Sequence, residues 1–300
     1  MKELNNKNCF LTGAASGIGR SFALALAKEG INLFITDINM EGLVKVKEEV
    51  EALGVKVIAE KCDVSKFEDF DRCAKQFHSK LGDVDLLINN AGIARGVLLE
   101  NINLDDWKKV IDVNLWSIIY SLKAFIPKML ERGSGHIVNV ASAAGILGSP
   151  EPLSYMASKF GVVGISEGLY GQISRFGIKV SVIIPLYIKT NIFFSGEEAK
   201  YPKKLVDGIG EEKLQEISQS MLEEMYDKAK SPDSVVKKYI AQIKKDQLYI
   251  YDSKGLLSVL AMKGANPKQY EEFLVKLNRD FRTSREAHFS KFGINLDDYL

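Results

Sequence analysis

The sequence has 300 residues, of which 46% are hydrophobic, and its formal net charge is +1. This hydrophobic content supports a sizeable core, while the near-neutral charge provides no basic surface for nucleic acid or for an anionic membrane. The composition therefore argues against both of these partners and favours small-molecule chemistry.

Short β-rich runs alternate with helical patterns along the chain. The predicted strands are 9–12, 32–37, 55–61, 84–89, 136–142, 179–185 and 248–251. The predicted helices are 17–29, 40–53, 66–80, 104–131, 154–176 and 232–245, with Ser65 and Ser231 as candidate N-caps. Seven strands separated by helices predict an α/β fold in which a parallel sheet is covered on both faces.

Two segments depart from this alternation. Residues 189–230 mix apolar, glycine and charged residues, and we interpret them as a substrate lid. Residues 253–300 continue beyond the last strand with helical patterns at 255–264 and 267–280. Because no Pro/Gly/Ser-rich linker divides the chain, we expect one domain over 1–252 and a helical extension of that same domain over 253–300.

The cysteines and histidines show no metal-binding spacing. They are Cys9, Cys62, Cys73, His78, His136 and His288, and we expect structural roles and no metal for all of them. The N-terminus carries no apolar signal core, and we find no uninterrupted apolar run of membrane length. The cytoplasm is therefore the expected compartment.

A glycine-rich turn follows the first predicted strand and opens the first predicted helix, in Thr12-Gly13-Ala14-Ala15-Ser16-Gly17-Ile18-Gly19. Small residues here let the backbone turn sharply and present the amides of a helix N-terminus to a pyrophosphate. The GxxxGxG spacing is neither the GxGxxG fingerprint nor a P-loop, and an ordinary strand-to-helix turn remains the alternative.

Asp37 ends the second predicted strand. A carboxylate there can accept hydrogen bonds from the hydroxyls of an adenosine ribose. It would repel a 2′-phosphate by roughly 4 kcal/mol per charge pair at about 4 Å and an effective dielectric near 20. Neither Ser16 nor Ile38 offers a compensating cation, so Asp37 favours NAD over NADP. The alternative is an aspartate that only caps the next turn.

Tyr155 and Lys159 stand four apart in a helical pattern, so one helix face would carry a phenol and an ammonium. A phenol titrates near ~10 in water, and a neighbouring cation would help it to exchange protons at neutral pH. This pair is the candidate chemical centre of the chain.

The glycine turn, the Asn89-Asn90-Ala91-Gly92 segment and the Tyr155/Lys159 pair occur in an order that resembles the short-chain dehydrogenase/reductase family. The resemblance covers about residues 6–252. It implies a Rossmann-like, doubly wound, seven-stranded parallel sheet and an NAD(P)-dependent oxidoreductase. The expected reaction interconverts a secondary alcohol and a ketone by hydride transfer with NAD.

The resemblance also implies a set of cofactor contacts. The residues expected at the cofactor are Gly13, Ser16, Gly17, Ile18, Gly19, Asp37, Asp63, Val64, Asn90, Ala91, Gly92, Tyr155, Lys159, Pro185, Ile188 and Thr190. Within this set, Asp63 and Val64 would lie beside the adenine. Asn90 to Gly92 would flank the cofactor and brace the sheet, and Asn89 has a structural role as an equal alternative.

Four residues match the catalytic residues of the family: Asn114, Ser142, Tyr155 and Lys159. Tyr155 would exchange the substrate proton, and Lys159 would lower its pKa and bind the nicotinamide ribose. Ser142 would orient the substrate oxygen, and Asn114 would hold a water through which protons reach solvent. The alternatives are a helix-capping Ser142 and a solvent-facing Asn114.

The chain departs from the family at Leu186, which replaces the usual glycine in Pro185-Leu186-Tyr187-Ile188-Lys189-Thr190. Leucine disfavours positive φ and adds bulk, so the backbone contacts to the nicotinamide carboxamide are less secure here.

Apolar lid residues favour a hydrophobic small-molecule substrate that is lipid-like, steroid-like or aromatic, with ordinary lid packing as the alternative. These residues are Tyr187, Ile192, Phe193, Phe194, Met221, Met225 and Tyr226. The long helices 104–131 and 154–176 resemble those that pair between subunits in the family, so we expect a homodimer or homotetramer. The tail could block an interface, cover a neighbouring site or enlarge its own pocket. An NADP-dependent carbonyl reductase, a non-catalytic dinucleotide sensor and an epimerase or dehydratase are the alternative functions.

Overall fold

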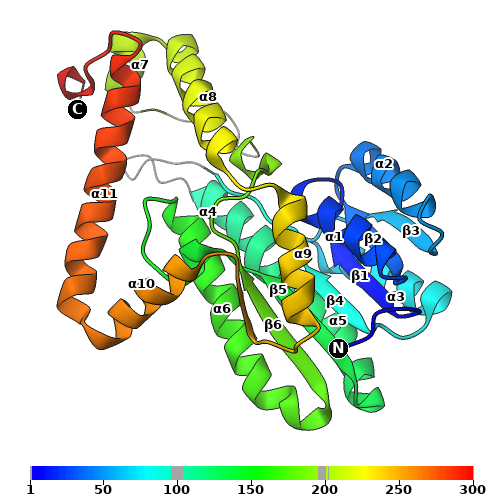
Figure 1. Cartoon of the computed structure of the whole chain (residues 1–300). Helices are drawn as coiled ribbons and strands as arrows, with labels where there is room; N and C mark the ends of the chain where they lie inside the picture. The colour runs from blue at the N-terminus through cyan, green and yellow to red at the C-terminus, as the bar shows by residue number, and fades with distance from the viewer. Residues whose placement is uncertain (1, 96–103, 195–200, 202, 300) are drawn as a thin grey trace.

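The computed structural model of the protein describes residues 2–95, 104–194, 201 and 203–299. Its centre is a sheet of seven parallel strands in the order β3-β2-β1-β4-β5-β6-β7 (Figure 1). The strands are β1 (Asn8–Thr12), β2 (Asn32–Asp37), β3 (Val57–Lys61), β4 (Leu86–Asn89), β5 (Gly135–Val140), β6 (Ile178–Ile184) and β7 (Tyr249–Tyr251). The predicted Rossmann-like parallel sheet is confirmed, and most strand ends fall within one or two residues of those expected.

Helices cover both faces of the sheet (Figure 1). One face carries α1 (Gly17–Lys28), α2 (Met40–Glu51) and α9 (Pro232–Ile243). The opposite face carries α3 (Phe67–Leu81), α5 (Ser117–Arg132) and α6 (Leu153–Ile173). In β1, Cys9 and Leu11 point into the first layer while Phe10 packs into the second. Burial on both faces explains why the strands are continuously apolar instead of alternating.

Residues 104–132 form one long helix interrupted by a π-helical turn. The segments are α4 (Leu104–Ile111), the π turn Asp112–Trp116 and α5. Its most apolar window has a mean hydropathy of 1.2, and 33% of that window is buried inside the protein. By length and composition this helix could cross a membrane, although core helices of soluble proteins pass the same test. The absence of a membrane segment therefore stays a prediction.

The lid and the tail are largely helical. The lid contains a 3₁₀ turn (Asn191–Phe194), α7 (Lys203–Ile209) and α8 (Glu211–Lys228), none of which the sequence pattern predicts. Residues 195–200 and 202, and the side chains of Phe193 and Phe194, lie outside the described residues. The tail forms α10 (Lys254–Ala265), α11 (Pro267–Ser290) and a 3₁₀ turn (Leu296–Asp298). Phe289 of α11 packs against Leu214 and Ile217 of α8, so the tail reaches the lid.

The two candidate N-caps differ from expectation. Helix α3 begins at Phe67 with Lys66 at its N-cap, so the prediction for Ser65 is wrong. The carboxylate of Asp63 explains this, because it accepts a hydrogen bond from the Ser65 hydroxyl at 2.6 Å. Ser231 occupies the N-cap of α9 as predicted, but its side chain makes no capping hydrogen bond.

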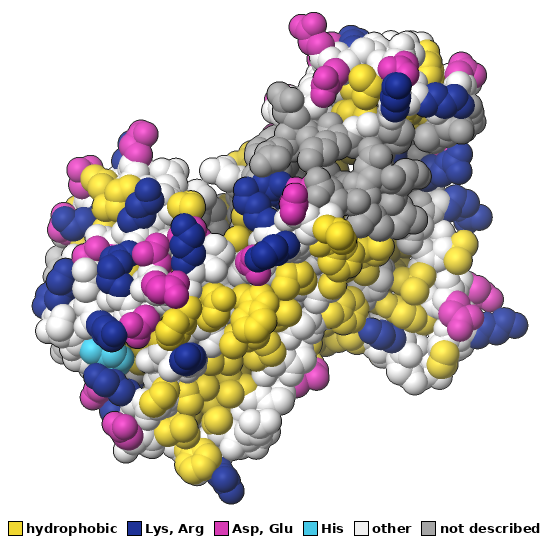
Figure 2. Space-filling model, turned by 180° about the vertical axis from the view of Figure 1, so that it is seen from behind, with side chains coloured by type: hydrophobic (Ala, Val, Ile, Leu, Met, Phe, Trp, Pro, Cys, Tyr) yellow, Lys and Arg dark blue, Asp and Glu magenta, His cyan; other side chains and the backbone are white. Residues whose placement is uncertain are grey.

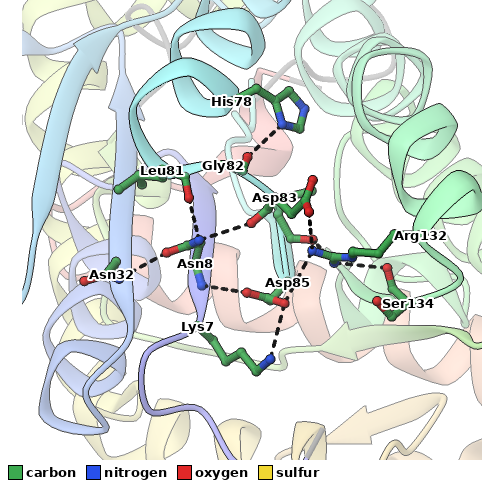
Figure 3. Close-up of polar contacts among 11 residues, drawn as sticks. Lys7, Asn8, Asn32, His78, Leu81, Gly82, Asp83, Asp85, Arg132 and Ser134 are labelled. Atoms are coloured by element: carbon green, nitrogen blue, oxygen red, sulfur yellow. Dashed lines mark hydrogen bonds and ion pairs between the residues drawn. The ribbon is translucent and has the colours of Figure 1, made fainter.

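A polar network joins the amino ends of β1 and β4 (Figure 3). The Asp85 carboxylate accepts a hydrogen bond from the Asn8 backbone at 3.0 Å and lies 3.6 Å from both Lys7 Nζ and Arg132 Nη1. The Asn8 side chain donates to the Leu81 carbonyl at 2.7 Å. This network fixes the ends of the strands that lie away from the switch point. At the carboxyl ends of β1 and β4, where the strand order reverses, an α/β sheet binds its ligands.

Candidate active site

The glycine turn at the end of β1 leaves no room for larger residues. Gly13 and Gly17 have φ of +66° and +54°, a region that favours glycine. A Cβ at Gly19 would lie 1.9 Å from the Gly13 carbonyl oxygen, and one at Gly13 would lie 2.7 Å from the Ala91 Cα. Backbone therefore occupies both positions, and the start of α1 stays open to a phosphate group that its amides can bind.

Asn90 holds this turn from the neighbouring strand. Its side-chain amide donates to the carbonyl oxygens of Thr12 and Gly13 at 3.1 and 3.0 Å. The Thr12 hydroxyl in turn accepts from the backbone amides of Asn90 and Ala91 at 3.0 and 3.1 Å. The structure thus brings the predicted Asn90–Gly92 segment against the glycine turn. Asn89 is buried and donates to Asn139 at 2.9 Å, which is a structural contact.

Asp37 touches the glycine turn directly. Its Oδ2 accepts from the Ala15 amide at 2.9 Å, and its Oδ1 accepts from the Asn39 amide at 2.9 Å. The second contact is the capping role that the sequence left open. Each carboxylate oxygen has a second lone pair, so capping and ribose binding are compatible. Arg20, in the first turn of α1, is paired with Glu49 at 2.5 Å.

Asp63 lies after β3, but its carboxylate is engaged locally. Its Oδ1 accepts from the amide and hydroxyl of Ser65, and its Oδ2 lies 3.4 Å from Lys66 Nζ. Val64 is buried among the side chains of the second layer. The contacts of both residues to an adenine stay predictions.

Asn114 lies in the π turn and is 1% exposed, so it is not the solvent-facing residue of the alternative reading. Its side chain accepts from the Ile93 amide at 2.8 Å and donates to the Ile93 carbonyl at 2.9 Å. It also lies 3.0 Å from the Ser158 hydroxyl. A π turn inserts one residue into a helix and often marks a functional site. Here it coincides with an asparagine that faces the loop after β4.

Ser142, Tyr155 and Lys159 meet where β5 ends and α6 begins. The Ser142 hydroxyl accepts from the Ala144 amide at 3.2 Å, and its interaction with the Tyr155 phenol acts to lower the pKa of that phenol. Lys159 Nζ donates to the Val140 carbonyl at 3.0 Å and lies 5.7 Å from the centre of the Tyr155 ring. Ser142 therefore caps a short turn and also reaches the phenol.

Gly92 connects this group to Asn114. A Cβ at Gly92 would lie 3.3 Å from Asn114 Oδ1 and 3.4 Å from Lys159 Nζ. The structure therefore brings all four predicted catalytic residues to one place, beside the predicted cofactor segment.

Burial dominates the titration of the central pair. It raises the pKa of the Tyr155 phenol well above its usual value, the hydrogen bond with Ser142 opposes this rise, and the charge of Glu151 adds to it. Burial also lowers the pKa of Lys159 to about 8. The sequence predicts that Lys159 lowers the phenol pKa, but in the structure desolvation raises this pKa, and the ammonium of Lys159 is directed at the Val140 carbonyl.

The segment after β6 lies beside Ser142 and the glycine turn, and Leu186 does not strain its backbone. The Pro185 carbonyl accepts from the Ala143 amide at 2.8 Å, next to Ser142. Among the described non-glycine residues only Asn6 and Asp246 have positive φ, so Leu186 adopts an ordinary backbone conformation. Ile188 is buried in the first layer, and a Cβ at Gly17 would lie 2.9 Å from the Thr190 side chain. Thr190 therefore closes over the glycine turn.

Sequence reasoning missed Glu151, which lies four residues before Tyr155, just ahead of α6. Its carboxyl is largely buried, which raises its pKa, and its charge raises the pKa of Tyr155 and of Tyr187. A glutamate between Pro150 and Pro152 carries no motif, and only the four-residue spacing to Tyr155 could have indicated it.

The sequence analysis also left the role of the tail open. Lys263 Nζ donates to the Ile146 carbonyl at 3.0 Å, and the Gly148 amide donates to the Tyr270 hydroxyl at 3.1 Å. Helices α10 and α11 thus hold the loop that follows Ser142 in their own subunit. Among the described residues, no group of histidine, cysteine and acidic side chains could hold a metal ion.

Comparisons with known proteins agree with this geometry. A family model described as short chain dehydrogenase matches residues 7–200. The chain is 39% identical over 202 residues to a cyclohexanol dehydrogenase of Acinetobacter sp. (strain SE19), which covers 67% of this chain and 80% of the relative.

Two solved structures extend the comparison. A short chain dehydrogenase/reductase from Burkholderia phymatum in complex with NAD is 28% identical, has a TM-score of 0.78 and covers 87% of this chain and 94% of its own. A metagenomic short-chain oxidoreductase in complex with NADP is 30% identical, has a TM-score of 0.58 and covers 60% of this chain and 82% of its own. Similar structures therefore hold either dinucleotide.

Proposed function

Because the chain belongs to the short-chain dehydrogenase/reductase family, whose members use NAD(P) to act on CH–OH groups, we propose that it interconverts a hydrophobic secondary alcohol and a ketone with NAD. The observation that carries this proposal is the meeting of Ser142, Tyr155, Lys159 and Asn114 beside Gly92. The glycine turn supports a dinucleotide, because the amides at the start of α1 can bind its pyrophosphate. Only glycine allows this close turn, since a Cβ at Gly13 or Gly19 would clash with backbone.

The proposed mechanism assigns one task to each side chain. Tyr155 takes the hydroxyl proton of the alcohol during oxidation and returns it during reduction. Ser142, whose interaction with the phenol acts to lower the pKa of Tyr155, orients the substrate oxygen and stabilises the charge that develops on it. Bound NAD supplies the hydride acceptor.

Lys159 and Asn114 support the proton transfer. Lys159 Nζ lies 5.7 Å from the centre of the Tyr155 ring, and in the proposal its charge favours the ionised phenol when substrate and cofactor are bound. The burial of Tyr155 acts in the opposite direction. In the proposal Lys159 also binds the nicotinamide ribose. In the proposal Asn114 holds a water through which the proton leaves toward solvent. Its Nδ2 already donates to the Ile93 carbonyl and the Ser158 hydroxyl, so the water would donate to the second lone pair of Oδ1.

The preference for NAD rests on Asp37. A 2′-phosphate at this position would meet the Asp37 carboxylate, and neither Ser16 nor Ile38 supplies a cation to compensate. The similar structures with NAD and with NADP do not decide between the two cofactors, so the charge at Asp37 is the supporting argument.

The hydrophobic substrate is supported by the lid. Tyr187, Met221 and Met225 line a cavity beside the tail, and methionine side chains adapt to apolar ligands of varied shape. The relative from Acinetobacter is a cyclohexanol dehydrogenase, so its substrate is an apolar secondary alcohol.

We further propose a homo-oligomer formed through the α4–α5 helix. Apolar side chains gather on the face seen in Figure 2, and the large exposed ones on this helix are Leu104, Trp116 and Leu130. Two thirds of its most apolar window are not buried within the chain. A second copy of the chain would cover this surface. The three buried free thiols fit the reducing cytoplasm that we propose as the compartment.

A substrate panel tests the proposed function. Secondary alcohols and ketones of increasing apolar size are presented with NAD(H) and with NADP(H), and the nicotinamide absorbance is followed. We expect turnover of apolar secondary alcohols with NAD. Efficient turnover of small polyols alone would contradict the substrate class, and a strong preference for NADP(H) would contradict the argument from Asp37. Cofactor binding without any turnover would instead indicate a dinucleotide sensor.

A further inference from the structure

The turn that follows Ser142 is hydrogen-bonded to the serine itself. Ser142 Oγ accepts from the Ala144 amide at 3.2 Å, and the Ser142 carbonyl accepts from the Gly145 amide at 2.9 Å. The Ala143 amide donates to the Pro185 carbonyl at 2.8 Å, which attaches the start of the turn to the segment after β6. The position of the Ser142 hydroxyl therefore depends on the position of this turn.

The same turn packs against the other two side chains of the proposed reacting centre. A Cβ at Gly145 would lie 2.6 Å from the Lys159 carbonyl oxygen, so the turn approaches the backbone of α6 too closely to admit a side chain there. Ala144 shares a small apolar cluster with Tyr155. Residues 143–147 are all buried. A displacement of the turn would therefore disturb the whole proposed centre.

Helices α10 and α11 of the tail hold the far end of the turn. The ammonium of Lys263 in α10 donates to the Ile146 carbonyl at 3.0 Å. The hydroxyl of Tyr270 in α11 accepts from the Gly148 amide at 3.1 Å. One side chain thus serves a backbone acceptor, and the other serves a backbone donor two residues later. The turn is bonded to the segment after β6 at its start and to the tail at its end.

Lys263 and Tyr270 are themselves held in place by packing. Lys263 Nζ lies 5.0 Å from the centre of the Phe160 ring on α6 and 5.7 Å from the centre of the Tyr270 ring. Figure 1 shows α10 beside α6, in agreement with this contact. The side chain of Leu274 closes the other side, since a Cβ at Gly148 would lie 3.0 Å from it. The two polar side chains and the end of the turn therefore form one packed unit.

An apolar cluster joins the tail to the turn. Leu256 of α10 is buried in the same cluster as Ile146 and Leu147 of the turn. Partly buried residues of α10 and α11 pack against this cluster. The hydrogen bonds of Lys263 and Tyr270 are thus the polar part of a larger contact, and a surface held by packing keeps such bonds in one geometry.

We propose that Lys263 and Tyr270 are positioning residues for the reaction, which hold the turn and thereby place the Ser142 hydroxyl against the substrate oxygen. The inference rests on the proposed function, because it takes Ser142 as the residue that orients this oxygen. A misplacement of about 1 Å can lower a rate by about 10²-fold, so the tail can control the reaction without touching the substrate.

Residue-resolved hydrogen exchange tests the support of the turn without requiring turnover. Tyr270→Phe keeps the ring and removes only the acceptor of the Gly148 amide. In the full-length protein this amide should exchange about two- to tenfold faster, the factor that the net loss of one hydrogen bond implies. Tyr170→Phe, at an exposed position on α6, is the matched control and should exchange as the wild type does. Unchanged exchange in Tyr270→Phe would overturn the proposal.

Kinetics connect the tail to the reaction. Tyr270→Phe and Lys263→Met should each lower kcat for the best substrate of the panel about two- to tenfold, while the affinity for NADH stays that of the wild type. Lys263→Arg keeps a donor for the Ile146 carbonyl and should restore most of the loss.

A double-mutant cycle then separates positioning from a general loss of activity. If Tyr270 acts through the Ser142 hydroxyl, Tyr270→Phe should change kcat by less than about twofold once Ser142→Ala has removed that hydroxyl. An equal fall of kcat in both backgrounds, or no fall in the wild-type background, would refute the positioning role. If no alcohol or ketone is turned over, the proposed function fails, and the exchange of the Gly148 amide alone decides whether the tail supports the turn.

Discussion

At the scale of single residues, backbone groups position the proposed catalytic side chains. Lys159 is held by the Val140 carbonyl, Asn114 by both backbone groups of Ile93, and Ser142 by the Ala144 amide. Removal of one side chain therefore leaves the anchors of the others intact. Single substitutions in this site should report on chemistry more than on folding.

Glu151 should set the pH dependence of oxidation. Its negative charge raises the pKa of Tyr155, and alcohol oxidation needs the ionised phenol. Glu151→Gln removes the charge, so the pKa of Tyr155 falls and the rising limb of kcat for oxidation moves to lower pH. A pH–rate profile of oxidation measures this shift.

The exposed Glu271 on α11 provides the control for this prediction. Glu271→Gln should leave the profile in place. A profile of Glu151→Gln that coincides with the wild type, or that moves to higher pH, would show that Glu151 does not act on the phenol.

Asp37 should control the choice of cofactor. Asp37→Asn removes the charge that repels a 2′-phosphate. The ratio of kcat/KM with NADP to kcat/KM with NAD should therefore rise about tenfold or more. A tenfold change corresponds to about 1.4 kcal/mol, which is less than the ~4 kcal/mol of repulsion expected for one charge pair. Steady-state kinetics with both cofactors measure the ratio. An unchanged ratio would mean that Asp37 only caps the turn through Ala15 and Asn39.

The candidate site could be predicted from sequence where its chemistry is carried by short motifs. The glycine turn, Asn90 to Gly92 and the Tyr155/Lys159 pair have fixed spacings, so local sequence determines their arrangement. Glu151 could not be found in this way, because its effect on Tyr155 depends on its burial, which no sequence motif shows. The pKa of Tyr155 was misjudged for the same reason, since sequence shows the neighbouring cation but not the desolvation.

At the scale of secondary-structure elements, the network at the amino ends of β1 and β4 should contribute to stability without affecting chemistry. Asp85→Ala leaves the Asn8 amide and two cations without their shared carboxylate, so the free energy of unfolding should fall by about 1–3 kcal/mol. Urea denaturation measures the loss, and NAD binding should be unchanged.

Asp83 is the matched control for Asp85. Its side chain is 60% exposed and contacts the same Arg132 at 3.6 Å. Asp83→Ala should change the free energy of unfolding by no more than about 0.5 kcal/mol, because exposed ion pairs contribute little. Equal losses for the two variants would refute the role given to the Asp85 carboxylate.

Helices and strands could be predicted where the apolar pattern is strong. Turns within helices and helix caps could not be predicted as well. The seven strands follow from their continuous apolar runs. The π turn at Asn114 is not visible in the pattern of 104–131, because a single inserted residue barely changes the period. The prediction of Ser65 as an N-cap was wrong because its hydroxyl donates to Asp63. Helix α8 was missed because most of its residues are polar or charged, and only Leu214 and Ile217 are buried, so its sequence shows no clear apolar pattern.

At the scale of the whole molecule, the apolar surface of the α4–α5 helix should determine assembly. Trp116 is 45% exposed on this helix, and aromatic residues are enriched at interface centres. Trp116→Glu should convert the oligomer to monomers, which light scattering detects as a fall in mass. Val275→Glu, at an exposed site on α11, is the control and should keep the wild-type mass. A monomeric wild type would contradict the proposed assembly.

We propose that the tail is part of the same domain. Leu256 of α10 is buried against Val162 and Val163 of α6, and α11 packs on both the loop after Ser142 and the lid. We propose that residues 253–300 enlarge the pocket of their own subunit, one of the roles that the sequence left open. The sequence could not choose among them, because the contacts of a helical tail depend on which surfaces it reaches.

The most direct test of the central claim is the effect of Tyr155→Phe on turnover and on cofactor binding. The substitution removes only the hydroxyl that exchanges the proton. We therefore expect kcat for the best substrate of the panel to fall by about 10²–10⁴-fold, while the affinity for NADH, measured by fluorescence titration, stays near that of the wild type. Tyr170→Phe, at an exposed position on the same helix, should retain full activity. Turnover by Tyr155→Phe at the wild-type rate would contradict the account.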